Sequence, residues 1–140
     1  MPGESTTPDL VELGERFLEA ANRRDFDAIM SFFAPDAVLG SGDALRMTFE
    51  GVAAIRGFWQ DWFASYEELW AGLEEVLDLG NGVVFGVLIQ KARLVGSSGE
   101  VRLRSGVVGE WVDGLIVRVT LRRDIEEARA AAMRLAEERE

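Results

Sequence analysis

Few kinds of side chain in this sequence could move a proton. The chain has 140 residues and contains no histidine and no cysteine. This composition removes the commonest general base, the commonest ligand of transition metals, and thiolate chemistry. A Ser-His-Asp triad is therefore excluded, and acid–base catalysis would require Asp, Glu, Arg, the single tyrosine Tyr66 or the single lysine Lys91.

Neither the acidic pairs nor the glycine-rich segments predict a metal or cofactor site. Glu67-Glu68 and Glu74-Glu75 are adjacent residues whose side chains point apart, whereas a metal ion needs clustered carboxylates. The segment GNGVVFG at 80–86 lacks the following helix that a phosphate-binding loop requires. We therefore expect no metal and no cofactor.

The charge balance bears on the possible partners. Asp and Glu number 25 against 15 Lys and Arg, which gives a net charge of -10. Nucleic-acid binding needs a basic surface, so this balance disfavours it. No apolar run approaches the ~18 residues of a membrane span, and the first ten residues lack the features of a secretory signal. The sequence predicts a cytoplasmic protein that binds neither nucleic acid nor membrane.

The first half of the chain has the periodicity of helices. After a flexible tail at 1–6, the sequence Thr7-Pro8-Asp9 predicts a helix with Thr7 as N-cap that runs to about Asn22. A short helix follows from Asp25 and is ended by Pro35. A third helix after Gly51 carries an apolar, mainly aromatic stripe: Ile55, Phe58, Trp59, Trp62, Phe63 and Tyr66.

The second half reads mainly as strands joined by tight turns. Alternating apolar residues and Gly/Asn/Asp turns predict strands at 37–39, 45–50, 69–79, 83–95, 101–111 and 115–123, and a closing helix at 125–139. Successive hairpins favour an antiparallel sheet. We therefore expect one α+β domain over 7–140, in which a curved, cone-shaped antiparallel sheet wraps around the N-terminal helices and a C-terminal helix follows.

Strand alternation and the helical stripe together predict which side chains face a pocket. One face of each long strand, together with the first and third helices, would enclose an apolar site with isolated polar groups, as small-molecule sites do. A core filled by its own side chains is the alternative interpretation. The predicted lining comprises Phe17, Trp59, Trp62, Phe63, Leu88, Gln90, Ser105, Val107, Val119 and Leu121.

The strand at 83–95 also predicts a second copy of the chain. It is apolar on both faces and must be covered on both, whereas the predicted helices cover one. We expect a homodimer through the outer face of the sheet, where Arg102, Arg104 and Arg118 would lie near Glu110 and its symmetry mates. Solvated strand residues on a monomer are the alternative.

Three segments resemble one superfamily. The chain is similar to the SnoaL-like, nuclear-transport-factor-2-like domains, whose cone-shaped α+β (cystatin-like) fold is shared with ketosteroid isomerases and limonene epoxide hydrolases. The resemblance extends from about residue 9 to residue 128. The segments that carry it are RFLEAANRRDFDAIMSFFAPDAV (16–38), FEGVAAIRGFW (49–59) and GLIVRVTLRRDIEEA (114–128).

The resemblance also indicates where these enzymes keep their catalytic groups. The oxyanion-hole tyrosine, general base and second acid of the isomerases fall at Phe17, near Ser41 and near Val107. By the same resemblance, the catalytic positions of the epoxide hydrolases fall at Leu88, Gln90 and Leu121. None of these side chains is an acid or a base at neutral pH. Asp43 is the only acid near the Ser41 position.

The sequence therefore supports three functions, in this order. The first is a domain whose pocket binds a small hydrophobic molecule with little or no catalysis. The second is an isomerase, polyketide cyclase or epoxide hydrolase with relocated acidic groups, for which Asp43, Tyr66, Glu110 and Asp124 are the catalytic candidates. The third is a homodimeric interaction module with a filled core.

Overall fold

The chain folds as a six-stranded curved sheet with helices on both faces. The structure is a computed structural model, and it describes residues 9–41 and 48–139. The predicted tail at 1–6 lies outside the described residues. The elements in chain order are α1 (Leu10–Asn22), α2 (Phe26–Met30), β1 (Phe33–Ser41), β2 (Thr48–Glu50), α3 (Val52–Ala64), β3 (Tyr66–Gly80), β4 (Val83–Leu94), β5 (Glu100–Val112), β6 (Leu115–Arg122) and α4 (Ile125–Glu138).

Three of the described helices, α1, α2 and α4, begin where an aspartate side chain bonds free backbone N–H groups, whereas α3 begins after Gly51 without such a bond. The Asp9 carboxylate accepts hydrogen bonds from the N–H groups of Val11 and Glu12, at 3.1 and 3.2 Å. Asp9 is therefore the N-cap of α1, not Thr7 as predicted, and its carboxylate bonds two of the N–H groups that α1 leaves free. Asp25 and Asp124 cap α2 and α4 in the same way.

The sheet has the order β2-β1-β6-β5-β4-β3 and is mostly antiparallel. The predicted curved antiparallel sheet is confirmed with one exception, since β1 runs parallel to β6. The connection between those two strands contains α3 and the hairpins, which gives the chain enough length to return in the same direction. The turn at Asp113-Gly114 has positive φ at both residues, 52° and 80°, as a tight hairpin requires.

Several element boundaries differ from the predictions. The second helix ends at Met30 and not at Pro35, which belongs to β1. Tyr66 opens β3 instead of extending the third helix, which ends at Ala64. The first strand is longer than 37–39 and includes Pro35, because the pairing of β1 with β6 is irregular between Phe33 and Val38. An irregularity of this kind accommodates a residue that has no N–H to donate.

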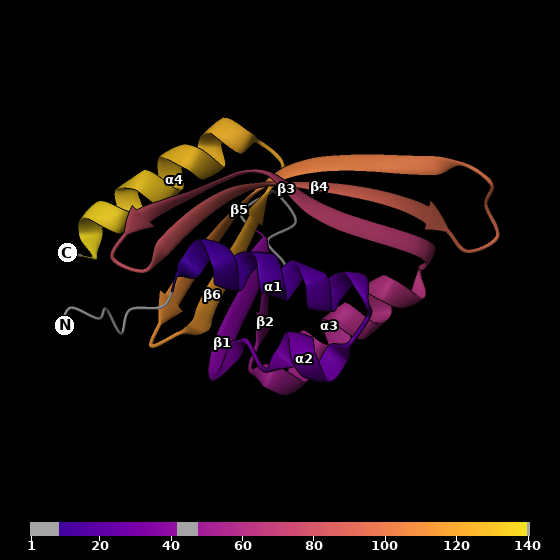
Figure 1. Ribbon diagram of the computed structural model, residues 1–140, viewed down its shortest axis with the longest axis horizontal. Helices are drawn as coiled ribbons and strands as arrows, with labels where there is room; N and C mark the ends of the chain where they lie inside the picture. Colours follow the sequence, from indigo (N-terminus) through magenta and orange to yellow (C-terminus); the bar gives the residue numbers. More distant parts are fainter. Residues whose placement is uncertain (1–8, 42–47, 140) are drawn as a thin grey trace.

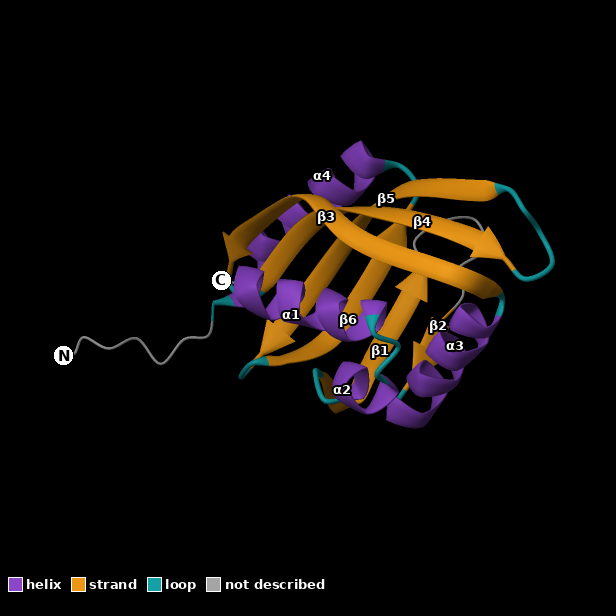
Figure 2. Cartoon of the chain, turned by 45° about the vertical axis from the view of Figure 1, so that its right-hand side comes forward, coloured by secondary structure: helices purple, strands orange, loops and turns teal. Residues whose placement is uncertain are grey.

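The two faces of the sheet are covered by different helices (Figures 1 and 2). The inner face is covered by α1, α2 and α3, and α4 lies across the outer face. Ala128, Ala132 and Ala136 of α4 are buried in one cluster with outer-face residues of the sheet, which include Val83, Phe85, Val87 and Val108. Small side chains let a helix lie close to a sheet, and the β4 members of this cluster, Val83, Phe85 and Val87, are almost completely buried.

The position of α4 removes the reason given above for a homodimer. The apolar outer face of β4 around Phe85 is covered by this helix, so a second copy is not needed there. Self-association through the rest of the outer face stays a prediction, which sedimentation velocity would test. Within the described residues, no helix is long and apolar enough to cross a membrane.

Candidate functional site

A cavity of about 120 Å³ lies between the inner face of the sheet and helices α1 and α3. No acidic, basic or hydroxyl side chain of the described residues lines it, and its polar side chains are two amides and two indoles. The lining consists of Leu10, Gly14, Phe17, Leu18, Ala21, Asn22, Leu39, Trp59, Phe63, Leu69, Ala71, Leu73, Val76, Val84, Gly86, Leu88, Gln90, Val107, Gly109, Trp111, Ile116, Val119 and Leu121.

The helical wall of the cavity follows from the spacing of apolar residues on α1. Leu10, Gly14, Phe17 and Ala21 recur every three or four residues and so share one face of the helix. Gly14 leaves a gap in that face, since a methyl group at its position would meet no atom within 4 Å. The cavity is therefore partly a consequence of a small residue at a core-facing position.

Aromatic rings form the wall that α3 contributes. The ring of Trp59 stacks on Phe63 at 5.8 Å and meets Phe17 of α1 edge to face at 6.1 Å. Such pairs hold large side chains in fixed orientations. The indole N–H of Trp59 is buried and has no hydrogen-bond partner.

The side chain of Asn22 fixes the end of α1 to the sheet. Its amide nitrogen donates to the carbonyl of Ala71 at 2.9 Å, and its oxygen accepts from the N–H of Ala71 at 2.8 Å. Both polar ends of the amide are thus occupied by one backbone unit of β3. Asn22 closes the cavity at this position and has little capacity left for a ligand.

Gln90 is a second polar wall residue that remains available, in addition to the indole N–H of Trp59. It lies on the inner face of β4, opposite Leu103 of β5 and Ala71 of β3. No hydrogen bond to another described residue engages its side-chain amide. A glutamine amide can donate and accept at once, so it could orient a ligand that carries a carbonyl or hydroxyl group.

The structure brings most of the predicted pocket residues to the cavity. Two of them are not in its lining. Trp62 stacks instead on Phe58, at 6.3 Å, and meets Tyr66, at 5.2 Å. Ser105 shares the inner face with Leu88, its partner in the sheet, but lies beyond the cavity. The predicted residues that line it are Phe17, Trp59, Phe63, Leu88, Gln90, Val107, Val119 and Leu121.

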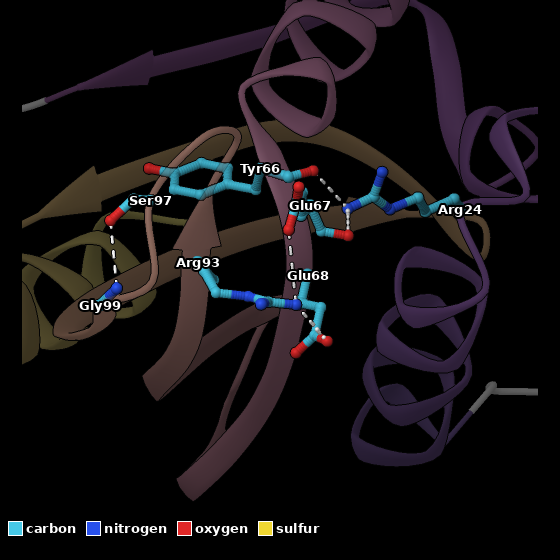
Figure 3. Close-up of polar contacts among 7 residues, drawn as sticks. All are labelled: Arg24, Tyr66, Glu67, Glu68, Arg93, Ser97 and Gly99. Carbon is cyan, nitrogen blue, oxygen red and sulfur yellow. Dashed lines mark hydrogen bonds and ion pairs between the residues drawn. The ribbon is translucent and has the colours of Figure 1, made fainter.

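The described catalytic candidates lie outside the cavity. Glu110 is on the outer face, 3.6 Å from the guanidinium of Arg118. Asp124 accepts a hydrogen bond from the N–H of Glu127 at 3.0 Å and serves as a helix cap. The backbone carbonyl of Tyr66 accepts a hydrogen bond from the guanidinium of Arg24, and the phenol ring of Tyr66 points away from that arginine (Figure 3).

Two further positions lie at or beyond the limits of the described structure. Asp43 is outside the described residues. Ser41 ends β1 beside Leu121 of β6, as its pairing in the sheet shows. The catalytic candidates stay predictions, and no described acid adjoins the cavity.

The sequence analysis missed a second group of lining residues. The alternation along β4 and β5 that places Leu88 and Val107 on the inner face also places Val84, Gly86 and Gly109 there. The same pattern could therefore have predicted these three lining residues. Alternation along the strand places Ile116 on the same outer face as Arg118, but Ile116 lines the cavity. The pairing of β5 with β6 is irregular between Glu110 and Trp111, so alternation along β6 reverses there.

Ion pairs are concentrated on the outer face. Arg129 of α4 donates two hydrogen bonds to the carboxylate of Glu75, at 3.0 and 3.1 Å, and these lower the pKa of Glu75. Arg104 of β5 hydrogen-bonds Glu74 at 2.6 Å and lowers its pKa. Both acids are thus held in their charged form, on the side of the sheet away from the cavity.

Several solved structures have the same fold at low sequence identity. A protein of unknown function from Burkholderia pseudomallei, described as NTF2-like, is 18% identical, with a TM-score of 0.73 and coverage of 86% of this chain and 95% of that one. A ketosteroid isomerase-like protein from Catenulispora acidiphila, in complex with trimethylamine, is 16% identical, with a TM-score of 0.71 and coverage of 83% and 85%.

A third similar structure is assigned to a polyketide cyclase group. This putative SnoaL-like polyketide cyclase from Shewanella denitrificans is 12% identical, with a TM-score of 0.72 and coverage of 92% and 99%. No curated protein matches this chain in sequence. The sequence pattern of the SnoaL-like domain matches residues 14–119, which include most of α1, all elements from α2 to β5, and the first part of β6. The chain therefore belongs to the SnoaL-like domain family.

Proposed function

We propose that the chain binds a small, neutral, hydrophobic molecule in the inner cavity, with little or no catalysis. The observation that carries this proposal is the chemistry of the wall. Apolar side chains surround the space, no described ionisable group adjoins it, and Gln90 has an unused amide. A preformed apolar hollow with one or two orienting polar groups is the usual form of a small-molecule site.

The volume of the cavity suits a compact ligand. Engineered apolar cavities of about 150 Å³ take up benzene. The cavity described here, at about 120 Å³, is of similar size. One of the similar structures was determined in complex with trimethylamine, so a protein of this fold can hold a small organic molecule.

The wall chemistry disfavours the two alternatives. An isomerase, cyclase or epoxide hydrolase must move protons, which requires an acid or base within hydrogen-bond reach of the substrate. No described residue supplies such a group to the cavity. A module with a filled core would not retain a cavity of this volume.

Matched neutral and charged probes would test the proposal. Benzene and cyclohexanone should bind and shift backbone resonances of the cavity residues, and cyclohexanone should also shift the side-chain amide of Gln90. Benzoate should bind at least about tenfold more weakly, because an uncompensated carboxylate is costly to remove from water. Titrations followed by ¹H–¹⁵N NMR give the three affinities.

Two valines of β5 provide a variant and its control. Val107→Trp places an indole in the cavity and should abolish binding of both neutral probes. Val112→Trp makes the same change at a position 44% exposed and should leave binding unchanged. Circular dichroism checks that both variants fold. Tight binding of benzoate, or of benzene to Val107→Trp, would contradict the proposal.

A further inference from the structure

A second cavity, of about 200 Å³, lies on the opposite face of the sheet. It is formed between the outer face of β5 and β6 and one side of α4, whereas the inner cavity is lined by the opposite face of the sheet. Two arginines line it, one from the sheet and one from the helix. The full lining is Val108, Thr120, Arg122, Ala131, Arg134, Leu135 and Glu138.

Arg122 is held at this cavity by the register of the sheet. It pairs with Gly106 of β5, and Gly106 lies directly under Ala128 of α4. The guanidinium is therefore only partly exposed, and its Nε–H group is buried with no hydrogen-bond partner. A guanidinium keeps its charge at all physiological pH values, so a buried, unpaired N–H of this kind is costly.

Arg134 enters the same cavity from α4. In the described part of the chain, neither Arg134 nor Arg122 takes part in an ion pair. Their neighbours differ, since Arg118 of β6 lies beside Glu110, and Arg129 of α4 is bonded to Glu75. The chain has 25 acidic side chains, and one of them, Glu138, lines the same cavity, yet no ion pair within the described residues joins it to either arginine.

We propose that this cavity binds a small oxyanion, a carboxylate or phosphate group, between Arg122 and Arg134. Planar guanidinium groups bind such oxyanions through charge-assisted and often bidentate hydrogen bonds. An oxyanion would give the buried Nε–H of Arg122 the acceptor that it lacks, and the Thr120 hydroxyl could donate to the same ligand. The carboxylate of Glu138 also lines the cavity and would oppose an anion there. This site does not depend on the function of the inner cavity.

Titration with inorganic phosphate, at constant ionic strength set by chloride, tests the proposal. The Nε–H resonance of Arg122 in a ¹H–¹⁵N spectrum should shift and saturate. Arg122→Gln and Arg134→Gln should each weaken phosphate binding on the order of tenfold, because each removes a charge-assisted hydrogen bond. Glu138→Gln should tighten binding, because it removes a like charge. A parallel titration with acetate shows whether the site accepts carboxylates as well as phosphate.

Arg102→Gln is the matched control. It makes the same change of charge at an exposed arginine of β5, which forms an ion pair with Glu100 two residues away. Phosphate affinity of this variant should stay within about twofold of the unchanged protein, because long-range effects of one exposed charge are largely screened by salt.

Three results would overturn the proposal. The first is a shift that does not saturate, and the second is an equal loss of affinity in Arg102→Gln. The third is a combination of two observations: phosphate does not bind the unchanged protein, and the unchanged protein is a dimer that Arg122→Gln dissociates. The acceptor for Arg122 would then be a carboxylate of a second copy of the chain. Arg134 and Glu138 are exposed, so their variants keep the test valid if Arg122→Gln does not fold.

Discussion

The two faces of β4 are built from alternate residues of the same twelve-residue strand, yet they pack differently. On the outer face, Val83, Phe85 and Val87 are at most 1% exposed. On the inner face, Val84, Leu88 and Gln90 are only partly buried and line the cavity. Similar apolar composition therefore gives a close-packed core on one side of the strand and a hollow on the other.

The covering helices account for the difference. On the outer face, α4 presents alanines to the sheet, and Gly106 lets Ala128 approach closely. On the inner face, large rings of α1 and α3 contact one another and form part of the cavity wall. Small side chains therefore allow close approach over β4, whereas the larger rings border a space; the second cavity also lies on the outer face, but over β5 and β6.

The largest effect should come from emptying the outer core. Phe85→Ala removes a fully buried ring and should lower the free energy of unfolding by about 3–5 kcal/mol. Leu88→Ala on the inner face should cost less than about 2 kcal/mol, because that side chain already borders an empty space. Urea unfolding measures both, and equal losses would show that the faces are packed alike.

Adding a methyl group is the opposite kind of change, and it should also cost more stability on the outer face than on the inner face. A Cβ at Gly106 would lie 2.4 Å from the Cβ of Ala128, so Gly106→Ala should cost about 1–3 kcal/mol. A Cβ at Gly86 would meet the flexible end of Leu73 at 3.0 Å, so Gly86→Ala should cost less than about 1 kcal/mol. Urea unfolding measures both changes. A larger loss of stability in Gly86→Ala than in Gly106→Ala would show that the inner face is the more closely packed one.

Filling the inner hollow should be tolerated. Val107→Leu adds one methylene group beside the cavity. It should leave the free energy of unfolding unchanged or raise it by up to about 1 kcal/mol. The neutral probes of the inner cavity should bind it more weakly as the space shrinks. Thermal unfolding with and without benzene measures both effects, and a loss of stability above 1 kcal/mol would mean that the wall is already full.

The smallest effect should be the pH dependence that the outer ion pair confers. The hydrogen bonds from Arg129 lower the pKa of Glu75 from its usual value of 4.5, so the folded state binds that proton less tightly than the unfolded state. The contribution is present above about pH 4.5 and is lost as the pH falls through the lower, folded-state pKa.

The pair can be tested by removing its titrating group. Glu75→Gln should flatten the part of the acid unfolding curve below pH 4.5, as measured by circular dichroism. Glu68→Gln is the control on the same strand, since Glu68 is exposed and its partner Arg93 also contacts Glu67. An equal flattening in the control would contradict a specific role for Glu75.

Much of the strand layout could be predicted from local signals. The turns at Asn81 and Asp113 have positive φ and join strands close to the predicted ranges. Alternation on β4 and β5 placed Leu88, Gln90 and Val107 on one face, and all three line the cavity. These signals depend only on residues close together in the chain, because a pleated strand alternates its side chains.

The errors share a cause, which is dependence on distant residues. The parallel pairing of β1 with β6 joins strands separated by most of the chain. The reversal of faces at Ile116 follows from an irregular pairing with β5, and no residue type in β6 signals it. The end of the third helix before Tyr66 depends on β3 beginning there and pairing with β4.

The sequence by itself determined the α+β class, the hairpins, and the absence of histidine and cysteine from any site. These follow from composition and from periods of two and three to four residues, which are local properties. Only the tertiary structure decided that α4 covers the outer face, that a hollow remains inside, and that Arg122 and Arg134 share a second cavity. Such features depend on how closely distant surfaces approach, and packing of the whole chain sets that distance.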